Sequence, residues 1–213
     1  MTPRSMVRSI VVLLFILASP LVGAATILVL GDSLSAGYGL RAEQSWPAHL
    51  ARRLEGIEGT HTVVNASVSG ETTAGGRARL PHALETHQPD VVVIELGAND
   101  GLRGLPLERM KSNLEAMIDH SRRAGAQVVL VGMQLPPNYG PAYANKFRQT
   151  FETVAAERNT AFVPFLLAGF ADRREWFQPD GLHPTAEAQP AILDNVWPAI
   201  EPMVRAGVKL SER

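Results

Sequence analysis

Short runs of β-branched and other apolar residues alternate with longer amphipathic stretches along most of the sequence. The runs predicted as strands are Thr26–Leu30, Thr62–Asn65, Val91–Leu96, Gln127–Val131 and Ala161–Val163. The stretches with helical periodicity are Trp46–Leu54, Gly76–Thr86, Pro106–Ala124, Tyr143–Arg158 and Thr185–Val204. Such alternation is typical of a parallel sheet with helices on both faces, and nearly continuous apolar strands suit that burial. We therefore predict the α/β class, as a single three-layer α/β/α domain with a five-stranded, mainly parallel sheet.

The composition fits one globular domain. Hydrophobic residues make up 46% of the 213 residues and charged residues 19%, which argues against disorder and against a multi-spanning membrane protein. A chain of this size buries about 70% of the surface of its unfolded form, so a core can stabilise it without cross-links. The sequence indeed contains no cysteine. Because neither a repeat nor a linker is visible, we predict one domain over residues 26–213.

The first 25 residues have the pattern of a signal peptide. Arg4 and Arg8 form a basic start, Ile10–Ala18 is apolar, and Val22–Ala25 supplies the small residues that a signal peptidase needs. An uncleaved anchor is the alternative, but the apolar stretch is shorter than the roughly 20 residues of a spanning helix. We predict cleavage after Ala24 or Ala25, no stable membrane anchor afterwards, and a periplasmic or secreted protein.

The charge balance bears on partners. The sequence has 20 basic and 21 acidic residues and a formal net charge of −1. No dense cluster of lysine or arginine could neutralise a row of phosphates. We therefore expect no nucleic-acid partner. A monomer that acts on small molecules is a separate expectation and does not follow from the charge.

Three polar loops directly follow predicted strands. They are Gly31–Ser35, Ala66–Gly70 and Gly97–Asp100. Ligands of parallel α/β sheets bind at the carboxyl ends of the strands, where such loops meet. The sequence therefore predicts that the functional site lies on these loops.

Ser33, in the first of these loops, needs a base to become a nucleophile, and that base must be oriented by a third group. His183 precedes the last predicted helix, and Asp180 lies three residues upstream across Gly181. A turn could bring this carboxylate to one imidazole nitrogen and leave the other free, although D-x-x-H alone is more often a structural turn. The other histidines lack such a carboxylate and are interpreted as surface or packing residues: His49, His61, His82, His87 and His120.

The site also needs donors for the oxyanion of a tetrahedral intermediate, each worth about 3 to 4 kcal/mol. The backbone N–H groups of Ser33 and Gly70 and the side-chain amide of Asn99 are candidates. Taken singly, Gly70 is better explained as a turn and Asn99 as a cap.

The order of these blocks along the chain is the strongest signal in the sequence. They are the G-D-S-L of Gly31–Leu34, Gly70, the G-x-N-D of Gly97–Asp100 and the D-x-x-H of Asp180–His183. Together they resemble the four blocks of the SGNH (GDSL) hydrolase family, over the whole chain after the leader. Segments such as Leu30–Gly39 are similar to its bacterial members with thioesterase, lysophospholipase and arylesterase activity.

The resemblance implies a flavodoxin-like fold and a serine esterase that forms an acyl-enzyme and needs neither cofactor nor metal. Ser33 would be the nucleophile, His183 the general base and then acid, and Asp180 the residue that orients the imidazole. Ser33 N–H, Gly70 N–H and Asn99 would form the oxyanion hole. The implied substrates are small acyl esters and lysophospholipids, with thioesters as a further class.

Four more features of the sequence bear on this site. Leu135 and Pro136 belong to a proline-rich segment that we expect to form one wall for the substrate, together with Gly70 and Asn99. The segment Glu71–Gly76 is predicted to be a mobile loop that closes over a bound acyl chain. Asp32 and Asp100 are predicted to shape their loops rather than to titrate in the reaction.

Three other interpretations remain open on the sequence. Asp32, Asp100 and the Asp180/His183 pair could belong to a metal-dependent phosphoesterase, although few carboxylates converge. An α/β-hydrolase would carry its serine in G-x-S-x-G at a strand-to-helix elbow, whereas this chain has G-D-S-L-S at Gly31–Ser35, after the first strand. A catalytically inactive periplasmic binding protein could share the fold, because fold alone does not establish chemistry.

Overall fold

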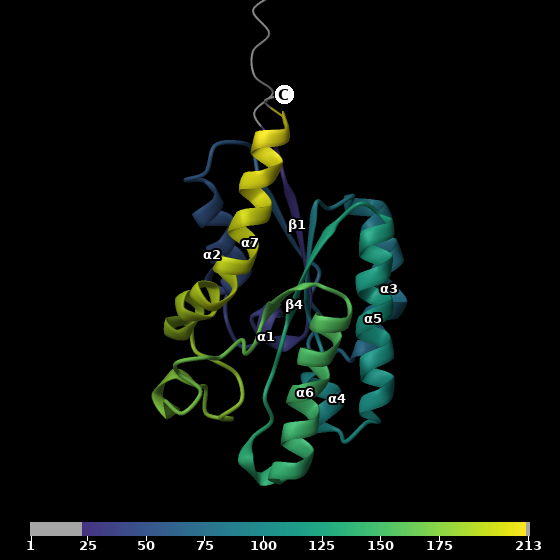
Figure 1. Ribbon diagram of the computed structural model, residues 1–213. Coiled ribbons are helices and arrows are strands. Elements are labelled where there is room, and N and C mark those ends of the chain that lie inside the picture. The colour runs from purple at the N-terminus through teal and green to yellow at the C-terminus, as the bar shows by residue number, and fades with distance from the viewer. Residues whose placement is uncertain (1–22, 212–213) are drawn as a thin grey trace, which may run out of the picture.

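The computed structural model describes residues 23–211, and its centre is one sheet of five strands. The strands are β1 (Thr26–Gly31), β2 (Thr62–Asn65), β3 (Val91–Glu95), β4 (Gln127–Val131) and β5 (Ala161–Val163). They lie in the order β2-β1-β3-β4-β5, and every neighbouring pair is parallel (Figure 1). In register, Leu28 of β1 faces Val64 on one side and Val92 on the other. The predicted five-stranded parallel sheet is confirmed.

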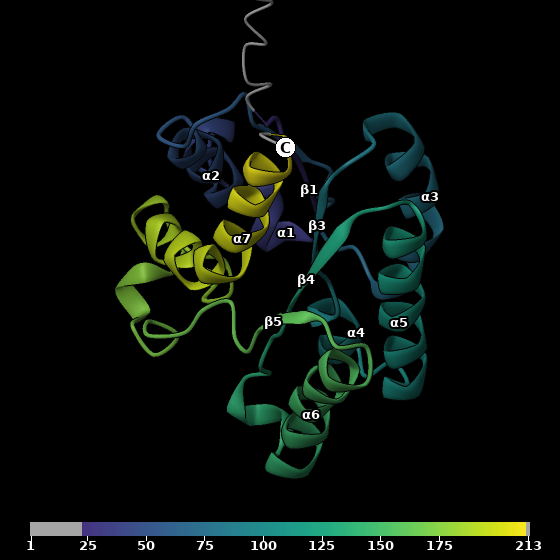
Figure 2. The ribbon, with the colours of Figure 1, turned by 45° about the horizontal axis from the view of Figure 1, so that its top comes forward.

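Helices cover both faces of the sheet, which gives the predicted three layers. They are α1 (Ser33–Ala36), α2 (Trp46–Leu54), α3 (Thr73–His87), α4 (Ala98–Leu102), α5 (Leu107–Arg123), α6 (Pro141–Glu157) and α7 (Gln189–Ser211). Helices α2 and α7 pack together on one face, and α3, α5 and α6 lie on the other (Figures 1 and 2). Short 3₁₀ turns lie at Ala42–Gln44, Pro137–Tyr139, Arg174–Trp176 and Ala186–Ala188.

Several helix boundaries differ from the sequence prediction by a few residues. Helix α3 begins at Thr73 rather than Gly76, because the Thr72 side chain accepts a hydrogen bond from Gly75 N at 3.3 Å and caps it. The last helix begins at Gln189 after a 3₁₀ turn rather than at Thr185. Two short helices, α1 and α4, occupy segments that were predicted as loops. Helix α1 has four residues and α4 has five, and such short helices show no helical periodicity in the sequence.

The core lies between the sheet and its two helical layers. Every residue of β3 is buried, and β1 is buried from Ile27 onward. Trp46 at the start of α2 is fully buried. In the apolar stripe of α5, Met110 and Met117 are completely buried. Its methionines therefore pack in the core, and burying each such side chain contributes about 1.5 to 3 kcal/mol.

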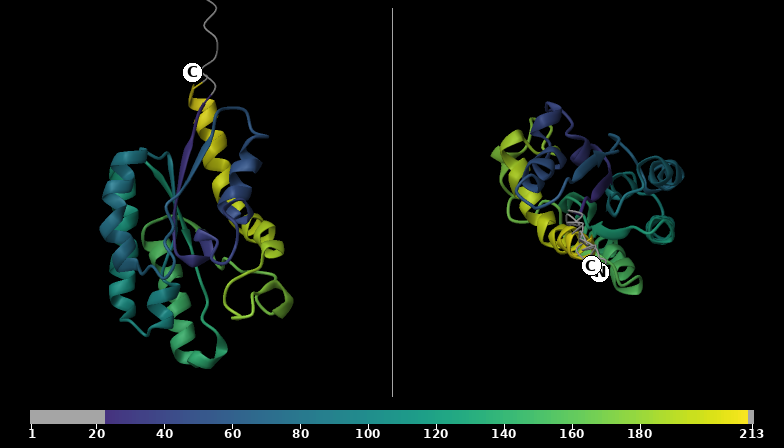
Figure 3. Two further views of the ribbon diagram at one scale, coloured as in Figure 1. Left: turned by 180° about the vertical axis from the view of Figure 1, so that it is seen from behind. Right: turned by 90° about the horizontal axis from the view of Figure 1, so that it is seen from above.

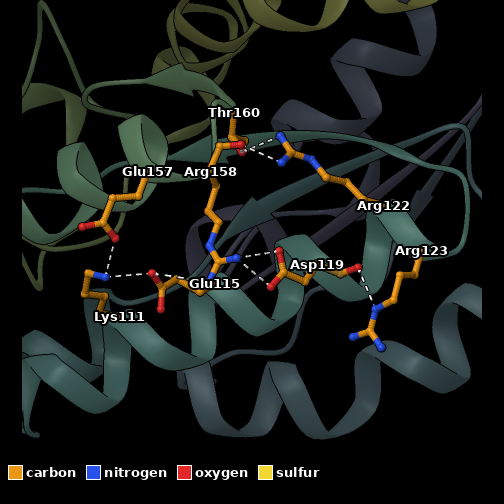
Figure 4. A network of polar contacts seen from close by, with 8 residues as sticks. All are labelled: Lys111, Glu115, Asp119, Arg122, Arg123, Glu157, Arg158 and Thr160. Carbon is orange, nitrogen blue, oxygen red and sulfur yellow. Dashed lines mark hydrogen bonds and ion pairs between the residues drawn. The ribbon is translucent and has the colours of Figure 1, made fainter.

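A network of charged side chains joins α5 to the end of α6 on the surface (Figure 4). Lys111 Nζ lies 2.7 Å from Glu115 and 2.6 Å from Glu157. Arg158 contacts Asp119 at 2.9 Å. Each exposed pair contributes little singly, and the network mainly fixes how α5 and α6 lie side by side.

The carboxyl ends of all the strands point to one edge of the sheet. Helices α1 and α4 follow β1 and β3 directly at this edge. Figure 3 shows that α7 runs away from it and ends at the opposite edge. Within residues 23–211, none of the helices is long and apolar enough to cross a membrane.

Candidate active site

Ser33 is the first residue of α1, immediately after β1 and Asp32. The Asp32 side chain accepts a hydrogen bond from Leu34 N at 3.0 Å and so caps the helix. The Ser33 N–H is at the start of α1, and the first N–H groups of a helix have no acceptor within it. A Cβ on Gly31 would lie 2.8 Å from a Glu95 carboxylate oxygen. The glycine therefore allows β1 to pass against that side chain.

The histidine and its carboxylate lie in a tight turn between the fifth strand and the last helix. Asp180 Oδ1 accepts hydrogen bonds from Leu182 N at 2.9 Å and from His183 N at 3.0 Å. Asp180 Oδ2 lies 2.7 Å from His183 Nδ1. Burial raises the pKa of Asp180, but the hydrogen bonds from Leu182 and His183 outweigh it and lower that pKa to about 2. Asp180 is therefore a carboxylate throughout the neutral pH range.

His183 Nε2 faces the hydroxyl of Ser33, with 2.9 Å between Nε2 and Oγ. Since Nδ1 donates to the Asp180 carboxylate, Nε2 is free to accept the Ser33 proton. The structure thus brings together Ser33, His183 and Asp180 from two segments separated by 150 positions. This arrangement can activate a serine hydroxyl as a nucleophile.

Two of the predicted oxyanion donors, Asn99 and Gly70, have different hydrogen-bond partners. Asn99, in the first turn of α4, donates one side-chain hydrogen to Asp32 Oδ2 at 2.9 Å. Its second amide hydrogen remains for a ligand. Gly70 adopts φ +78°, which favours glycine, and its carbonyl accepts from Arg103 Nη2 at 2.8 Å. Among the hydrogen bonds of residues 23–211, none is donated by the Gly70 N–H.

A cavity of about 570 Å³ opens beside Ser33 and His183. Asn99 lines it, and so do Leu135 and Pro136, as predicted. Gly70 does not belong to its lining. Further apolar side chains line the cavity: Leu34, Leu102, Phe165, Leu167, Phe177 and Leu182. A largely apolar cavity with few polar groups suits an acyl chain.

Two buried carboxyl groups lie behind the nucleophile. Glu95 is completely buried, and its Oε2 accepts from Ser35 Oγ at 2.7 Å and from Asp32 N at 3.3 Å. Glu95 Oε1 has no hydrogen-bond partner among the described residues. Burial, and then the neighbouring charge of Asp32, raise the pKa of Glu95 well above its ordinary value. Burial likewise raises the pKa of Asp32 to about 6, against hydrogen bonds from Leu34 and Asn99.

The pKa shifts and the hydrogen bonds together favour a proton on Glu95 over one on Asp32. Asp32 accepts hydrogen bonds on both oxygens, which stabilises its charged form, whereas Glu95 has one oxygen without a partner. Glu95 was not predicted from the sequence as part of the site. The available signal was a single acidic residue at the end of an otherwise apolar strand, Val91–Glu95.

Two expectations about neighbouring loops need correction. The segment Glu71–Gly76 is not a loop throughout, because Thr73–Gly76 form the first turn of α3. Asp100 connects two helices rather than bracing only its own loop. Its carboxylate accepts from Thr73 N at 2.8 Å and from Thr73 Oγ1 at 2.5 Å. Asp32, by contrast, shapes its own turn as predicted.

The carboxylates that a metal-dependent phosphoesterase would use are engaged in hydrogen bonds. Asp32 binds Leu34 and Asn99, and Asp100 binds Thr73. In the described part of the chain, no group of three or more histidine, cysteine, aspartate or glutamate side chains is arranged to hold a metal ion. The side chains at the strand ends are instead arranged around a serine.

Comparison with known proteins agrees with this geometry. Residues 29–190 match the model of the GDSL-like lipase/acylhydrolase family. The chain belongs to this family. It is 47% identical over 192 residues to the esterase TesA of Pseudomonas aeruginosa, an alignment that covers 90% of this chain and 96% of the relative.

Other relatives have related activities in their names. The chain is 45% identical to an arylesterase of Vibrio mimicus, over 87% of this chain and 92% of that protein. It is 40% identical to thioesterase 1/protease 1/lysophospholipase L1 of Escherichia coli K12, over 85% of this chain and 86% of that protein. A solved structure of TesA, 49% identical, superposes with a TM-score of 0.81 over 84% of this chain and 99% of that chain.

Proposed function

We propose that this serine esterase hydrolyses acyl esters through an acyl-enzyme formed on Ser33. The observation that carries the proposal is the continuous line of hydrogen bonds from the Ser33 hydroxyl through His183 to Asp180. Its two links measure 2.9 Å and 2.7 Å. In such an arrangement the serine is the nucleophile, the imidazole takes its proton, and the carboxylate stabilises the imidazolium that forms.

The reaction then proceeds in two halves. In the first, Ser33 Oγ attacks the carbonyl carbon while its proton passes to His183 Nε2, and the imidazolium is stabilised by Asp180. The tetrahedral intermediate breaks when Nε2 returns the proton to the leaving alcohol or thiol. In the second half, His183 takes a proton from water as the water oxygen attacks the acyl carbon and forms a second tetrahedral intermediate. The imidazolium then returns this proton to Ser33 Oγ as the bond to the acyl carbon breaks, and the carboxylic acid leaves.

The negative oxygen of each intermediate is bound by fixed donors in this proposal. The Ser33 N–H at the start of α1 and the second amide hydrogen of Asn99 are the best placed. Asp32 supports Asn99, because accepting one amide hydrogen fixes the direction of the other. The Gly70 N–H, which donates to none of the other described residues, is assigned as the third donor.

The cavity supports acyl esters as substrates. Its volume of about 570 Å³ falls within the range of small-molecule sites, roughly 300 to 1,000 Å³. Leu135 and Pro136 form an apolar wall beside Asn99. On this basis, and by analogy with the names of its relatives, we assign aryl esters and lysophospholipids as substrates, with thioesters as a second class.

We also propose that residues 1–25 are a signal peptide, that residues 26–213 form the hydrolase domain, and that the protein works as an exported monomer. Most of the leader lies outside the described residues. Ala25 is buried, and its carbonyl accepts from Thr62 N at 2.9 Å. Of the two predicted cuts, this contact favours the one after Ala24, which leaves Ala25 with the folded domain and shortens the signal peptide to residues 1–24.

The proposal is tested with purified protein and p-nitrophenyl esters of graded acyl length. We expect Ser33→Ala to lower kcat by about 10⁵- to 10⁶-fold with little change in thermal unfolding. An organophosphonate should inactivate the wild type and add one mass equivalent at Ser33, whereas EDTA should leave the activity unchanged. Ser112→Ala, on the exposed side of α5, is the matched control. Retained turnover in the Ser33 variant refutes the mechanism.

A further inference from the structure

The nucleophile and histidine segments are connected by more than the hydrogen bond between Ser33 and His183. A second set of hydrogen bonds runs beside it and passes through Gln178, a half-buried residue that the mechanism above does not use. Gln178 lies five positions before His183, in the segment that closes the turn around Asp180.

The backbone of Gln178 fixes the base of that turn. Its N–H donates to the carbonyl of His183 at 2.8 Å, and its own carbonyl accepts from Gly181 N at 2.9 Å. An isolated antiparallel bridge joins the neighbouring residues Phe177 and Pro184. The backbone on both sides of Asp180 and His183 is therefore tied together at Gln178.

The side chain of Gln178 reaches the nucleophile segment. Its Nε2 donates to the carbonyl of Tyr38 at 2.7 Å and to the carbonyl of Pro184 at 3.2 Å. Tyr38 N in turn donates to the carbonyl of Ser33 at 3.1 Å. A path of hydrogen bonds thus leads from Ser33 through Tyr38 and Gln178 to His183.

Tyr38 also contacts the imidazole directly. The centres of the Tyr38 and His183 rings are 4.3 Å apart, and the ring planes are inclined by 34°. Asp180 fixes one nitrogen of the imidazole, and the Tyr38 ring limits rotation out of its plane. Because the Tyr38 carbonyl is bound by Gln178, the position of this ring depends on the same glutamine.

We propose that Gln178 is a positioning residue that sets the distance and angle between the Ser33 hydroxyl and the His183 imidazole, a role that rests on the proposed function. It acts through the Tyr38 carbonyl and through the backbone of the His183 turn. Misplacing reacting groups by about 1 Å can cost on the order of 100-fold in rate. Loss of the Gln178 amide therefore lowers kcat without altering the cavity that binds the acyl chain.

The chemistry of this position requires an amide. Two carbonyl oxygens face Nε2, so the residue must donate two hydrogen bonds without carrying a charge. A glutamate of the same size would direct a carboxylate oxygen at both carbonyls. Gly39 makes room for the amide, because a Cβ there would lie 2.2 Å from Gln178 Oε1.

The test compares Gln178→Met, which keeps the size but removes the donors, with Gln178→Glu, which reverses the polarity. Steady-state kinetics with p-nitrophenyl butyrate should show kcat lowered about 10-fold in the first and about 100-fold in the second, with KM within about twofold. The rate of inactivation by an organophosphonate should fall in parallel, since it reports the same serine and histidine. Gln149→Met, an exposed residue of α6, is the control.

The outcomes separate the two proposals. If the wild type does not hydrolyse the ester, or if Ser33→Ala retains activity, the proposed function itself fails. If the wild type is active and Gln178→Met and Gln178→Glu both keep its kcat, only the positioning role is overturned. A rise in KM at constant kcat also overturns it, because that result would place Gln178 in substrate binding. Thermal unfolding of each variant, measured beside the kinetics, identifies any variant that is merely misfolded.

Discussion

Two acidic regions flank Ser33, and the same functional group behaves in opposite ways in them. Asp180 is partly exposed, with 38% of its side chain accessible, and hydrogen bonds lower its pKa to about 2. Asp32 and Glu95 are buried, and burial raises both of their pKa values. The surroundings, rather than the carboxyl group itself, decide which acid is charged.

The difference separates two tasks. The exposed acid contacts His183 and, in the proposed mechanism, stabilises the positive charge that develops on the imidazole during turnover. The buried pair instead fixes the backbone at Ser33 and the amide of Asn99. We therefore expect changes to Asp180 to affect mainly the rate, and changes to Glu95 to affect mainly the stability.

Asp180→Asn should produce the largest effect. An amide of the same size cannot stabilise the imidazolium and favours the wrong tautomer of His183, so we expect kcat to fall by about 10⁴-fold. The low pKa of Asp180 stabilises the fold above the ordinary pKa of 3.8, and this contribution is lost as pH falls through about 2. Because the group is partly exposed, removing it should cost less than about 1 kcal/mol at pH 7. Steady-state kinetics measures the fall in kcat, and urea unfolding measures the loss of stability. A large loss of stability would contradict the expectation that Asp180 affects mainly the rate.

Asp32→Asn should have an intermediate effect on the rate. The single side-chain oxygen of the new asparagine can accept a hydrogen bond from Leu34 N or from Asn99, while its NH₂ group faces the other donor. We expect kcat to fall by about 10- to 100-fold, less than the 10²- to 10³-fold expected for removing an oxyanion donor outright. A double variant with Asn99→Ala measures the coupling. Fully additive losses would mean that Asp32 does not act through Asn99.

Glu95→Gln should have the smallest effect on the rate, within about threefold, because glutamine imitates the protonated acid. The stability, however, should change with pH. The folded state of the wild type binds the Glu95 proton more tightly than the unfolded state does, so the stability falls as pH rises above the ordinary pKa of 4.5. Glutamine has no such proton to lose. The free energy of unfolding of Glu95→Gln, relative to that of the wild type, should therefore rise by up to about 1.4 kcal/mol per pH unit.

Urea midpoints of both proteins at pH 5, 6.5 and 8 test this difference. Asp32, whose pKa is raised from 3.8 to about 6, gives the wild type a further fall in stability between those values. Parallel curves for the wild type and Glu95→Gln would show that Glu95 is not protonated in the folded state.

The sequence predicted the sheet well because buried parallel strands carry an unmistakable apolar run. Val91–Glu95 and Gln127–Val131 were found at or within one residue of their ends for this reason. The ends of helices were harder, since they depend on single caps such as Thr72. The short helices α1 and α4 follow strands too closely to show a helical period.

The candidate site was predictable where residue order alone carries the information. Ser33, His183 and Asp180 lie together as their motifs suggested, and Leu135 and Pro136 line the cavity. Glu95 and Gln178 were missed for a physical reason. Glu95 contacts a residue that lies 60 positions away along the chain, and Gln178 contacts one that lies 140 positions away. No local sequence pattern indicates such contacts.

The separation of 150 positions between Ser33 and His183 has a consequence for biosynthesis. The ribosome delivers the N-terminal part of a protein first. A nascent chain therefore contains Ser33 long before the imidazole of His183 has been made. In the proposed mechanism, acyl transfer becomes feasible only after translation has passed His183, so turnover indicates a molecule that extends beyond this residue and has folded.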